Sequence, residues 1–252
     1  MNDMARNALS KVPEVTLIFW IIKVLATTLG ETGGDTLSMS MHLGYLVSTG
    51  IFAAIFAVAV MVQITAKKFH PVIYWVTIIA TTTVGTTLAD FADRSLGIGY
   101  AGGTTILFLA LMASLFIWKR TLGTVAVDSV SSPKSEMFYW ITIMFSQTLG
   151  TALGDWAADT AGLGYNGGML LFGSMLAIIA AAYYRTKISH TVLFWMAFIL
   201  TRPLGAVVGD FLDKPLDHGG LALSRYAASA TLVGLIAFFI FAFSHKPAAK
   251  LH

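Results

Sequence analysis

The chain contains no cysteine and few charged residues. The lack of cysteine among its 252 residues excludes disulfide bonds, thiolate metal sites and cysteine nucleophiles. Charged residues make up 12% of the chain, whereas an ordinary soluble domain carries about 25%. Hydrophobic residues make up 56%, and the mean hydropathy is +0.75. This composition predicts an integral membrane protein.

Several familiar chemical motifs are also missing. The sequence has no glycine-rich loop for phosphate, no HExxH zinc motif and no Ser/His/Asp order typical of a hydrolase. Its net charge of +3 comes from basic residues in the short segments between apolar stretches. We therefore expect no enzyme, no nucleic-acid partner, and no cofactor apart from a bound metal cation.

Eight apolar stretches of roughly the 20 residues needed to cross a bilayer recur along the chain. They predict an all-α integral membrane protein that forms one membrane domain over residues 1–252. Their approximate bounds are 14–34, 43–66, 71–91, 99–118, 137–157, 165–184, 190–210 and 219–243.

Basic and acidic residues lie at opposite ends of these stretches. Lys67, Lys119 and Arg185 represent the basic set, and Asp90 and Asp155 represent the acidic set. The positive-inside rule places the basic ends in the cytoplasm. We expect a multi-pass protein of the bacterial inner (plasma) membrane with both termini cytoplasmic. Its partners are the lipid bilayer and a small ion or solute, and assembly into a homo-oligomer stays open.

A four-fold internal repeat organises the chain. In each copy an aromatic-Trp pair is followed ten residues after the Trp by a glycine, and five residues later by an aspartate. The copies span about 14–68, 69–134, 135–189 and 190–245. Their glycines are 55, 65 and 55 residues apart, so a shift of 120 maps the first half onto the second. The chain is a duplication of a duplication. Each copy has two spans, which predicts parallel copies. The aspartates are Asp35, Asp90, Asp155 and Asp210.

Polar residues at four-residue spacing form a stripe along one face of the first helix of each copy. Lipid cannot satisfy such groups, so the stripe is expected to face the interior of the bundle or water. The stripe consists of Lys23, Thr27, Glu31 and Asp35; Thr82, Thr86 and Asp90; Gln147, Thr151 and Asp155; and Arg202 and Asp210.

These residue types favour binding of a small cation. Carboxylate and hydroxyl oxygens are the ligands that hard divalent ions prefer. The leading hypothesis is a transporter or permeation protein for a cation such as Mn²⁺, with coupling to protons as an option. Lys23 and Arg202 would compete with the ion for the carboxylates. The predicted metal ligands are Glu31, Asp35, Asp90, Asp155 and Asp210, and the expected hydroxyl ligands are Thr27, Thr82, Thr86 and Thr151.

Three alternatives stay open from the sequence. Lys23 or Arg202 could form a purely structural ion pair with Glu31. The same two cations could instead bind a small organic anion or zwitterion as the transported substrate. The chain could also be a non-transporting scaffold, a sensor, or an intramembrane hydrolase that uses Asp90 and Asp93.

The repeated order of Trp, then Thr-Leu-Gly or Thr-Val-Gly, then Asp and Gly-Tyr resembles a bacterial family of uncharacterised membrane-anchored proteins built from a tandem repeat of unknown function. Examples are Thr28-Leu29-Gly30, Thr83-Val84-Gly85 and Gly164-Tyr165. The resemblance implies membrane location and repeats, without an activity. More loosely, the segment from Glu31 to Thr36 is similar to the Glu-x-Gly-Asp motif of small calcium and manganese exchangers. It has one extra residue before Gly-Asp and no basic residue after the aspartate.

Overall fold

The structure is a computed structural model that describes residues 10–249. Within this part the chain forms eight long helices and no strand, and seven of the helices are long and apolar enough to cross a membrane. The eighth, α6, is as long but more polar. The chain is therefore a multi-pass helical membrane protein. The helices are α2 (Leu17–Asp35), α3 (Gly44–Thr65), α4 (Pro71–Asp90), α5 (Tyr100–Leu122), α6 (Pro133–Asp155), α7 (Gly164–Arg185), α8 (His190–Asp213) and α9 (Arg225–Ala242).

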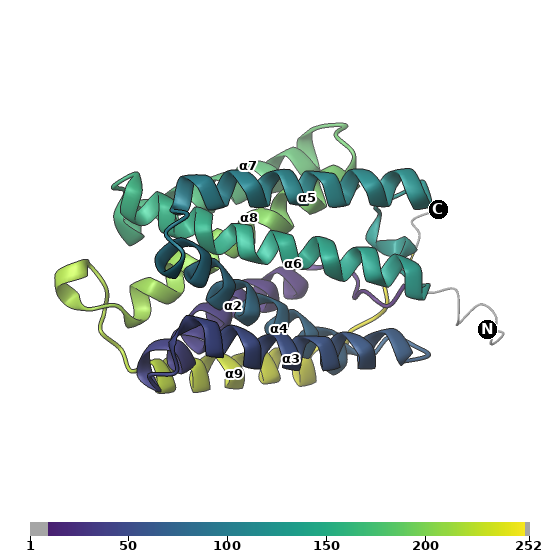
Figure 1. Cartoon of the computed structure of the whole chain (residues 1–252). Helices are drawn as coiled ribbons and strands as arrows, with labels where there is room; N and C mark the ends of the chain where they lie inside the picture. The colour runs from purple at the N-terminus through teal and green to yellow at the C-terminus, as the bar shows by residue number, and fades with distance from the viewer. Residues whose placement is uncertain (1–9, 250–252) are drawn as a thin grey trace.

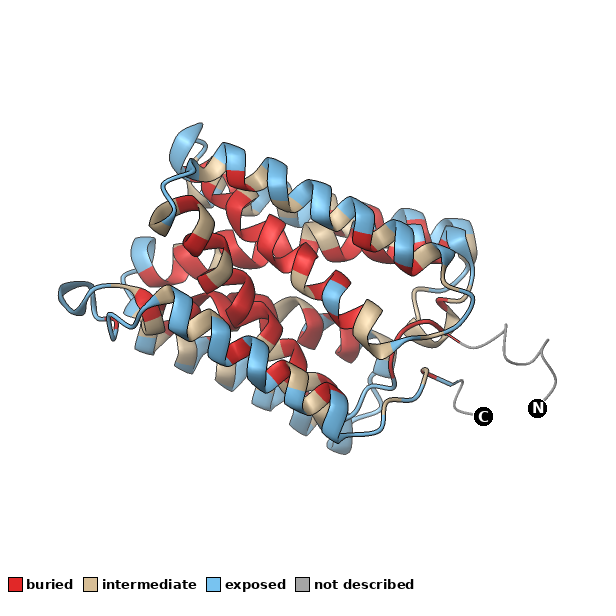
Figure 2. Ribbon diagram, turned by 90° about the horizontal axis from the view of Figure 1, so that it is seen from below, coloured by how far each residue is buried: buried red, intermediate tan, exposed pale blue. Residues whose placement is uncertain are grey.

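The helices form an inner ring and an outer layer (Figure 1). The ring is closed because α2 packs on α4, α4 on α6, α6 on α8, and α8 on α2. Each outer helix packs on the inner helix that follows it in sequence: α3 on α4, α5 on α6 and α7 on α8. The last outer helix, α9, packs on α2 and completes the pattern. Buried residues accordingly concentrate on the inner helices (Figure 2).

The repeated glycine lets neighbouring inner helices approach closely. A Cβ atom on Gly30 would lie 2.5 Å from Thr82 of the next inner helix, and one on Gly85 would lie 3.0 Å from Gln147. All four inner helices continue through these glycines, so the residues serve packing and do not break the helices. The four contacts run around the ring as Gly30 to Thr82, Gly85 to Gln147, Gly150 to Arg202, and Gly205 to Thr27.

An aromatic layer closes the ring at the end where the inner helices begin. The first aromatic residue of each copy contacts the Trp of the next copy, and the last copy contacts the first. Centroid distances are 5.4 Å for Phe19 and Trp75, 5.7 Å for Tyr74 and Trp140, 6.2 Å for Tyr139 and Trp195, and 5.8 Å for Phe194 and Trp20. Val12 is buried in the same apolar cluster, and Lys11 beside it pairs with Glu136 at 2.6 Å.

The opposite ends of the inner helices share a distinctive turn. Directly after Asp35, Asp90 and Asp155, the chain makes one π-helical turn, a wider form often found at functional sites. The glycine of each Gly-Tyr pair then begins the outer helix with a positive φ, as at Gly44 (72°) and Gly164 (62°). Glycine is favoured here because other residues rarely adopt this backbone conformation.

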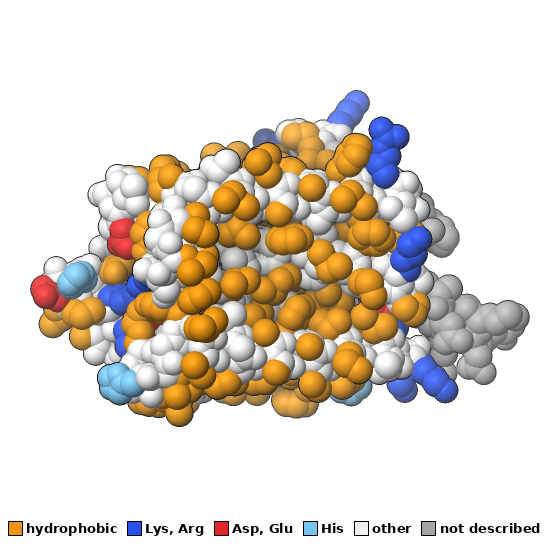
Figure 3. All heavy atoms as spheres, viewed as in Figure 1, with side chains coloured by type: hydrophobic (Ala, Val, Ile, Leu, Met, Phe, Trp, Pro, Cys, Tyr) orange, Lys and Arg blue, Asp and Glu red, His pale blue; other side chains and the backbone are white. Residues whose placement is uncertain are grey.

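The outer surface suits a bilayer. Figure 3 shows apolar side chains over the face between the two ends of the bundle, with lysine and arginine gathered at the end near the chain termini. Exposed large apolar residues come from every outer helix, for example Val58, Phe108, Ile178 and Phe241. Lipid tails can solvate such a surface, whereas water cannot.

The glycine contacts predict that alanine lowers stability at a glycine of the ring but not at a glycine with open space around it. Gly205→Ala would place a methyl group against the Thr27 side chain and backbone, and overpacking of this kind costs about 1–3 kcal/mol. We expect a lower midpoint of thermal unfolding in detergent. Gly173→Ala in α7 is the control, because nothing lies within 4 Å of its added Cβ. A Gly205→Ala protein as stable as this control would contradict the close packing of the ring.

Candidate functional site

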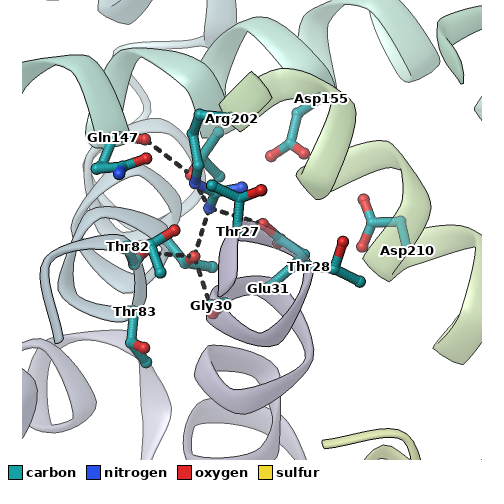
Figure 4. A network of polar contacts seen from close by, with 12 residues as sticks. Thr27, Thr28, Gly30, Glu31, Thr82, Thr83, Gln147, Asp155, Arg202 and Asp210 are labelled. Atoms are coloured by element: carbon teal, nitrogen blue, oxygen red, sulfur yellow. Dashed lines mark hydrogen bonds and ion pairs between the residues drawn. The ribbon is translucent and has the colours of Figure 1, made fainter. Parts of the chain in front are cut away.

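All twelve residues of the predicted polar stripe are buried, none with more than 4% of its surface exposed. Side chains from all four inner helices point toward one another inside the ring, as Figure 4 shows for part of the set. We call the inner group the polar centre: Lys23, Thr27, Glu31, Thr82, Thr86, Gln147, Thr151 and Arg202. We call the four repeated aspartates the acidic mouth: Asp35, Asp90, Asp155 and Asp210.

Arg202 of α8 connects the four inner helices. Its Nη2 atom donates to Glu31 Oε2 of α2 at 2.9 Å and to Thr86 Oγ1 of α4 at 2.6 Å. It also donates to Thr151 Oγ1 of α6. Arg202 is 0% exposed, so a single guanidinium nitrogen links it to the other three sides of the ring.

Other polar atoms of the centre have no hydrogen-bond partner among the described residues. These atoms are Lys23 Nζ, Arg202 Nε and Nη1, Thr82 Oγ1, and both amide atoms of Gln147. Lys23 Nζ lies 4.2 Å from the centroid of the Phe198 ring. Phe198 lies one helical turn before Arg202 in α8. Leaving buried donors unpaired is costly, by about 1–3 kcal/mol for a neutral group and more for a charged one. The centre therefore has donor capacity that the protein itself does not use.

Thr27 differs from these residues. Its hydroxyl donates to backbone carbonyls, those of Lys23 at 3.1 Å and Val24 at 2.9 Å in its own helix and that of Thr201 at 3.1 Å across the ring. Thr27 therefore stabilises the contact between α2 and α8, and its hydroxyl is already used by the fold.

Two cations bridge the aspartates of the acidic mouth in pairs. Arg94 lies 3.0 Å from Asp90 and 3.3 Å from Asp155. Lys214 lies 3.1 Å from Asp210 and also pairs with Asp35. Each cation thus joins the aspartate of its own copy to that of the next copy. The shift of 120 residues maps Arg94 onto Lys214, so the two bridges are equivalent in the duplicated chain.

The charge of Lys214 is held in place by its neighbours. Burial alone would disfavour the ammonium group, but the Asp210 and Asp35 carboxylates raise the pKa of Lys214 above its ordinary value. Lys214 therefore stays protonated at neutral pH. Arg225 adds a further cation at this end, 2.6 Å from Asp213 and 3.8 Å from Asp35.

The predicted metal ligands divide into two groups. Glu31, Asp35 and Asp210 each offer a carboxylate oxygen, and these oxygens lie within 4.8 Å of one another. Asp90 and Asp155 lie at the other bridge, with Arg94 between them. Three carboxylates suit a hard cation such as Mg²⁺ or Mn²⁺. Asp35 Oδ1 has no hydrogen-bond partner among the described residues and is available as a ligand atom.

Sequence reasoning missed the two bridging cations. Neither Arg94 nor Lys214 is among the site residues that the sequence predicts. The signal was present, because each follows the aspartate of its copy by four residues and the two are 120 residues apart. Asp93, paired with Asp90 in the hydrolase alternative, lies instead against Gly103 of α5.

Comparison with known proteins agrees with the repeat. Residues 18–69, 73–131, 138–189 and 193–246 each match the family model described as Repeat of Unknown Function (DUF347). No curated protein and no solved structure matches the chain. The resemblance to an uncharacterised tandem-repeat family is thereby confirmed. Four matches in succession cover most of the chain, which belongs to the family built from this Repeat of Unknown Function.

Proposed function

We propose that this protein is a membrane transporter that carries a small cation through the ring formed by α2, α4, α6 and α8. The observation that carries this proposal is the convergence of Glu31, Asp35 and Asp210 inside the ring, within 4.8 Å of one another. Carboxylates inside a membrane protein are costly and typically mark ion pathways. A divalent ion such as Mn²⁺ matches a site with several carboxylates.

The proposed ion competes with cations of the protein itself. Arg202 holds Glu31, and Lys214 holds Asp35 and Asp210. An arriving divalent ion would replace these contacts with shorter metal-oxygen bonds and free the two side chains. Release of Lys214 would also separate the first and fourth copies at the acidic mouth. Ion binding and opening of the mouth would therefore be coupled, and the same exchange could couple transport to protons.

A carrier fits the closed ends of the ring better than an open pore. The aromatic layer fills one end, and the ion pairs of Arg94 and Lys214 cross the other. A carrier opens one end at a time, whereas a pore needs a continuous path. In the transport cycle that we infer, the bridging ion pairs break at the outer side and the aromatic layer separates at the inner side.

The membrane orientation follows from the same proposal. The four copies would cross the bilayer in parallel, with both termini in the cytoplasm of a bacterial cell and the acidic mouth facing outward. The gathering of lysine and arginine at the end near the termini supports this orientation (Figure 3). The termini themselves, residues 1–9 and 250–252, lie outside the described residues.

Removing one carboxylate of the site tests the proposal. In proteoliposomes loaded with a Mn²⁺-sensitive dye, we expect Asp35→Asn to reduce Mn²⁺ uptake about tenfold or more, because it removes an ionised oxygen ligand, and loss even of a group that only supports a ligand typically costs about tenfold or more in metal affinity. Asp217→Asn is the matched control, since it removes the same charge from an exposed position in the turn before α9. Equal uptake by Asp35→Asn and wild type would reject the site. Wild-type vesicles that move no cation would instead indicate a non-transporting membrane protein.

Removing the competing cation has the opposite effect. Lys214→Met leaves Asp35 and Asp210 without their bridge, so we expect lower thermal stability without metal. Added Mn²⁺ should then raise the unfolding midpoint more than it does in wild type. Arg94→Met is the control, because it removes the equivalent bridge from a pair of aspartates without the third carboxylate. A Mn²⁺ response of Lys214→Met no larger than that of wild type would argue against competition.

A further inference from the structure

The polar centre contains more hydrogen-bond donors than its own acceptors can pair with. Within residues 10–249, Glu31 accepts from Arg202 Nη2 alone, and Lys23 Nζ, Arg202 Nε and Arg202 Nη1 have no hydrogen-bond partner. The amide of Gln147 is free as well. All of these side chains are 0–3% exposed, so bulk water does not satisfy them. Unused charged donors at this depth call for an acceptor that the chain does not provide.

By formal charge, the eight residues of the polar centre carry one net positive charge. Lys23 and Arg202 are cations, Glu31 is the one carboxylate, and the other five members are neutral threonines and a glutamine. A complementary ligand therefore carries one negative charge. A structural ion pair does not account for this arrangement, because Glu31 pairs with Arg202 while Lys23 rests on the Phe198 ring.

Departure from the repeat shows that these positions are specialised. The position of Lys23 is occupied by Ile78, Ile143 and Phe198 in the other copies, all buried. The position of Arg202 is occupied by Thr27, Thr82 and Gln147. Neutral residues thus fill the positions equivalent to Lys23 and Arg202 in the other copies. A copy of the repeat can therefore fold without either cation.

We propose that Lys23, Gln147 and Arg202 form a binding site for a small monovalent anion of carboxylate type, between the aromatic layer and the acidic mouth. Lys23 Nζ and Arg202 Nη1 and Nε supply charged donors, which make the stronger hydrogen bonds. The Gln147 amide nitrogen supplies a neutral one. This proposal rests on the proposed transport function only for how the anion enters. It implies that an anion accompanies the cation, or that both charges belong to one zwitterion.

Thermal unfolding of the purified protein in detergent tests the site directly. At constant ionic strength, formate or acetate is titrated against gluconate, a larger carboxylate that serves as the size control. A ligand that binds only the folded state raises the unfolding midpoint in a saturable way. We expect saturable stabilisation of the wild type by formate or acetate and none by gluconate. Equal effects of the three anions would overturn the proposal without any variant.

Three variants then separate a binding role from a structural one. Lys23→Met removes an unpaired buried charge, so we expect the unliganded protein to become more stable while its affinity for formate falls about tenfold or more. Glu31→Gln raises the net charge of the centre from one to two, so affinity should increase. Lys67→Met, at an exposed position after α3, is the control and should behave as wild type.

The outcomes are distinguishable from failure of cation transport. Asp35→Asn lies in the acidic mouth and should leave formate binding intact even where it abolishes Mn²⁺ uptake. Formate binding in a protein that moves no cation would support the anion site and reject the transport proposal. Unchanged formate binding in Lys23→Met, or weaker binding in Glu31→Gln, would overturn the anion site while cation transport could stand.

Discussion

The architecture depends on the close contact between a glycine of one inner helix and a polar side chain of the next. This contact recurs four times around the ring, at Gly30, Gly85, Gly150 and Gly205. Without a Cβ at these positions the helices approach far enough for Arg202 to reach three neighbours with one nitrogen. A bilayer offers no hydrophobic drive between helices, so packing and buried polar contacts must supply it. Small residues thus allow a protein surrounded by lipid to have a polar interior.

The symmetry of the ring differs from one layer to the next along its axis. The aromatic layer has a four-fold pattern, because each copy contributes the same pair of rings. The acidic mouth keeps only the two-fold pattern of the later duplication, with Arg94 and Lys214 as equivalent bridges. At the polar centre no symmetry remains, because Lys23, Glu31 and Arg202 each occur once. The aromatic layer and the acidic mouth thus retain the repeat, in full or in part. The polar centre, which has the most polar atoms without hydrogen-bond partners, departs from it.

Much of this arrangement could be predicted from the sequence. The number of helices, their approximate bounds and the inward direction of the stripe follow from hydropathy and from the cost of polar groups in lipid. The Trp, glycine and aspartate spacing identified the repeat. What spacing could not show is which copy neighbours which, and this order decides that Lys214 reaches Asp35, 179 residues away. Nor could it separate Thr27, whose hydroxyl serves the backbone, from Thr86 and Thr151, which bind Arg202.

If the protein transports ions as proposed, the order of charge along the ring limits what can pass through it. A cation approaching from the acidic mouth meets carboxylates first and then the positive charge of Arg202 and Lys23, which opposes further movement. An anion approaching from the same side is repelled by the carboxylates first and then attracted by Arg202 and Lys23. A cation alone and an anion alone therefore each face a barrier. The presence of the oppositely charged ion would lower this barrier, because charges of opposite sign attract strongly where water is scarce. In the proposed transporter, carboxylates at the mouth and an unpaired cation, Lys23, at the centre would match joint passage of both signs better than passage of a bare ion of either sign.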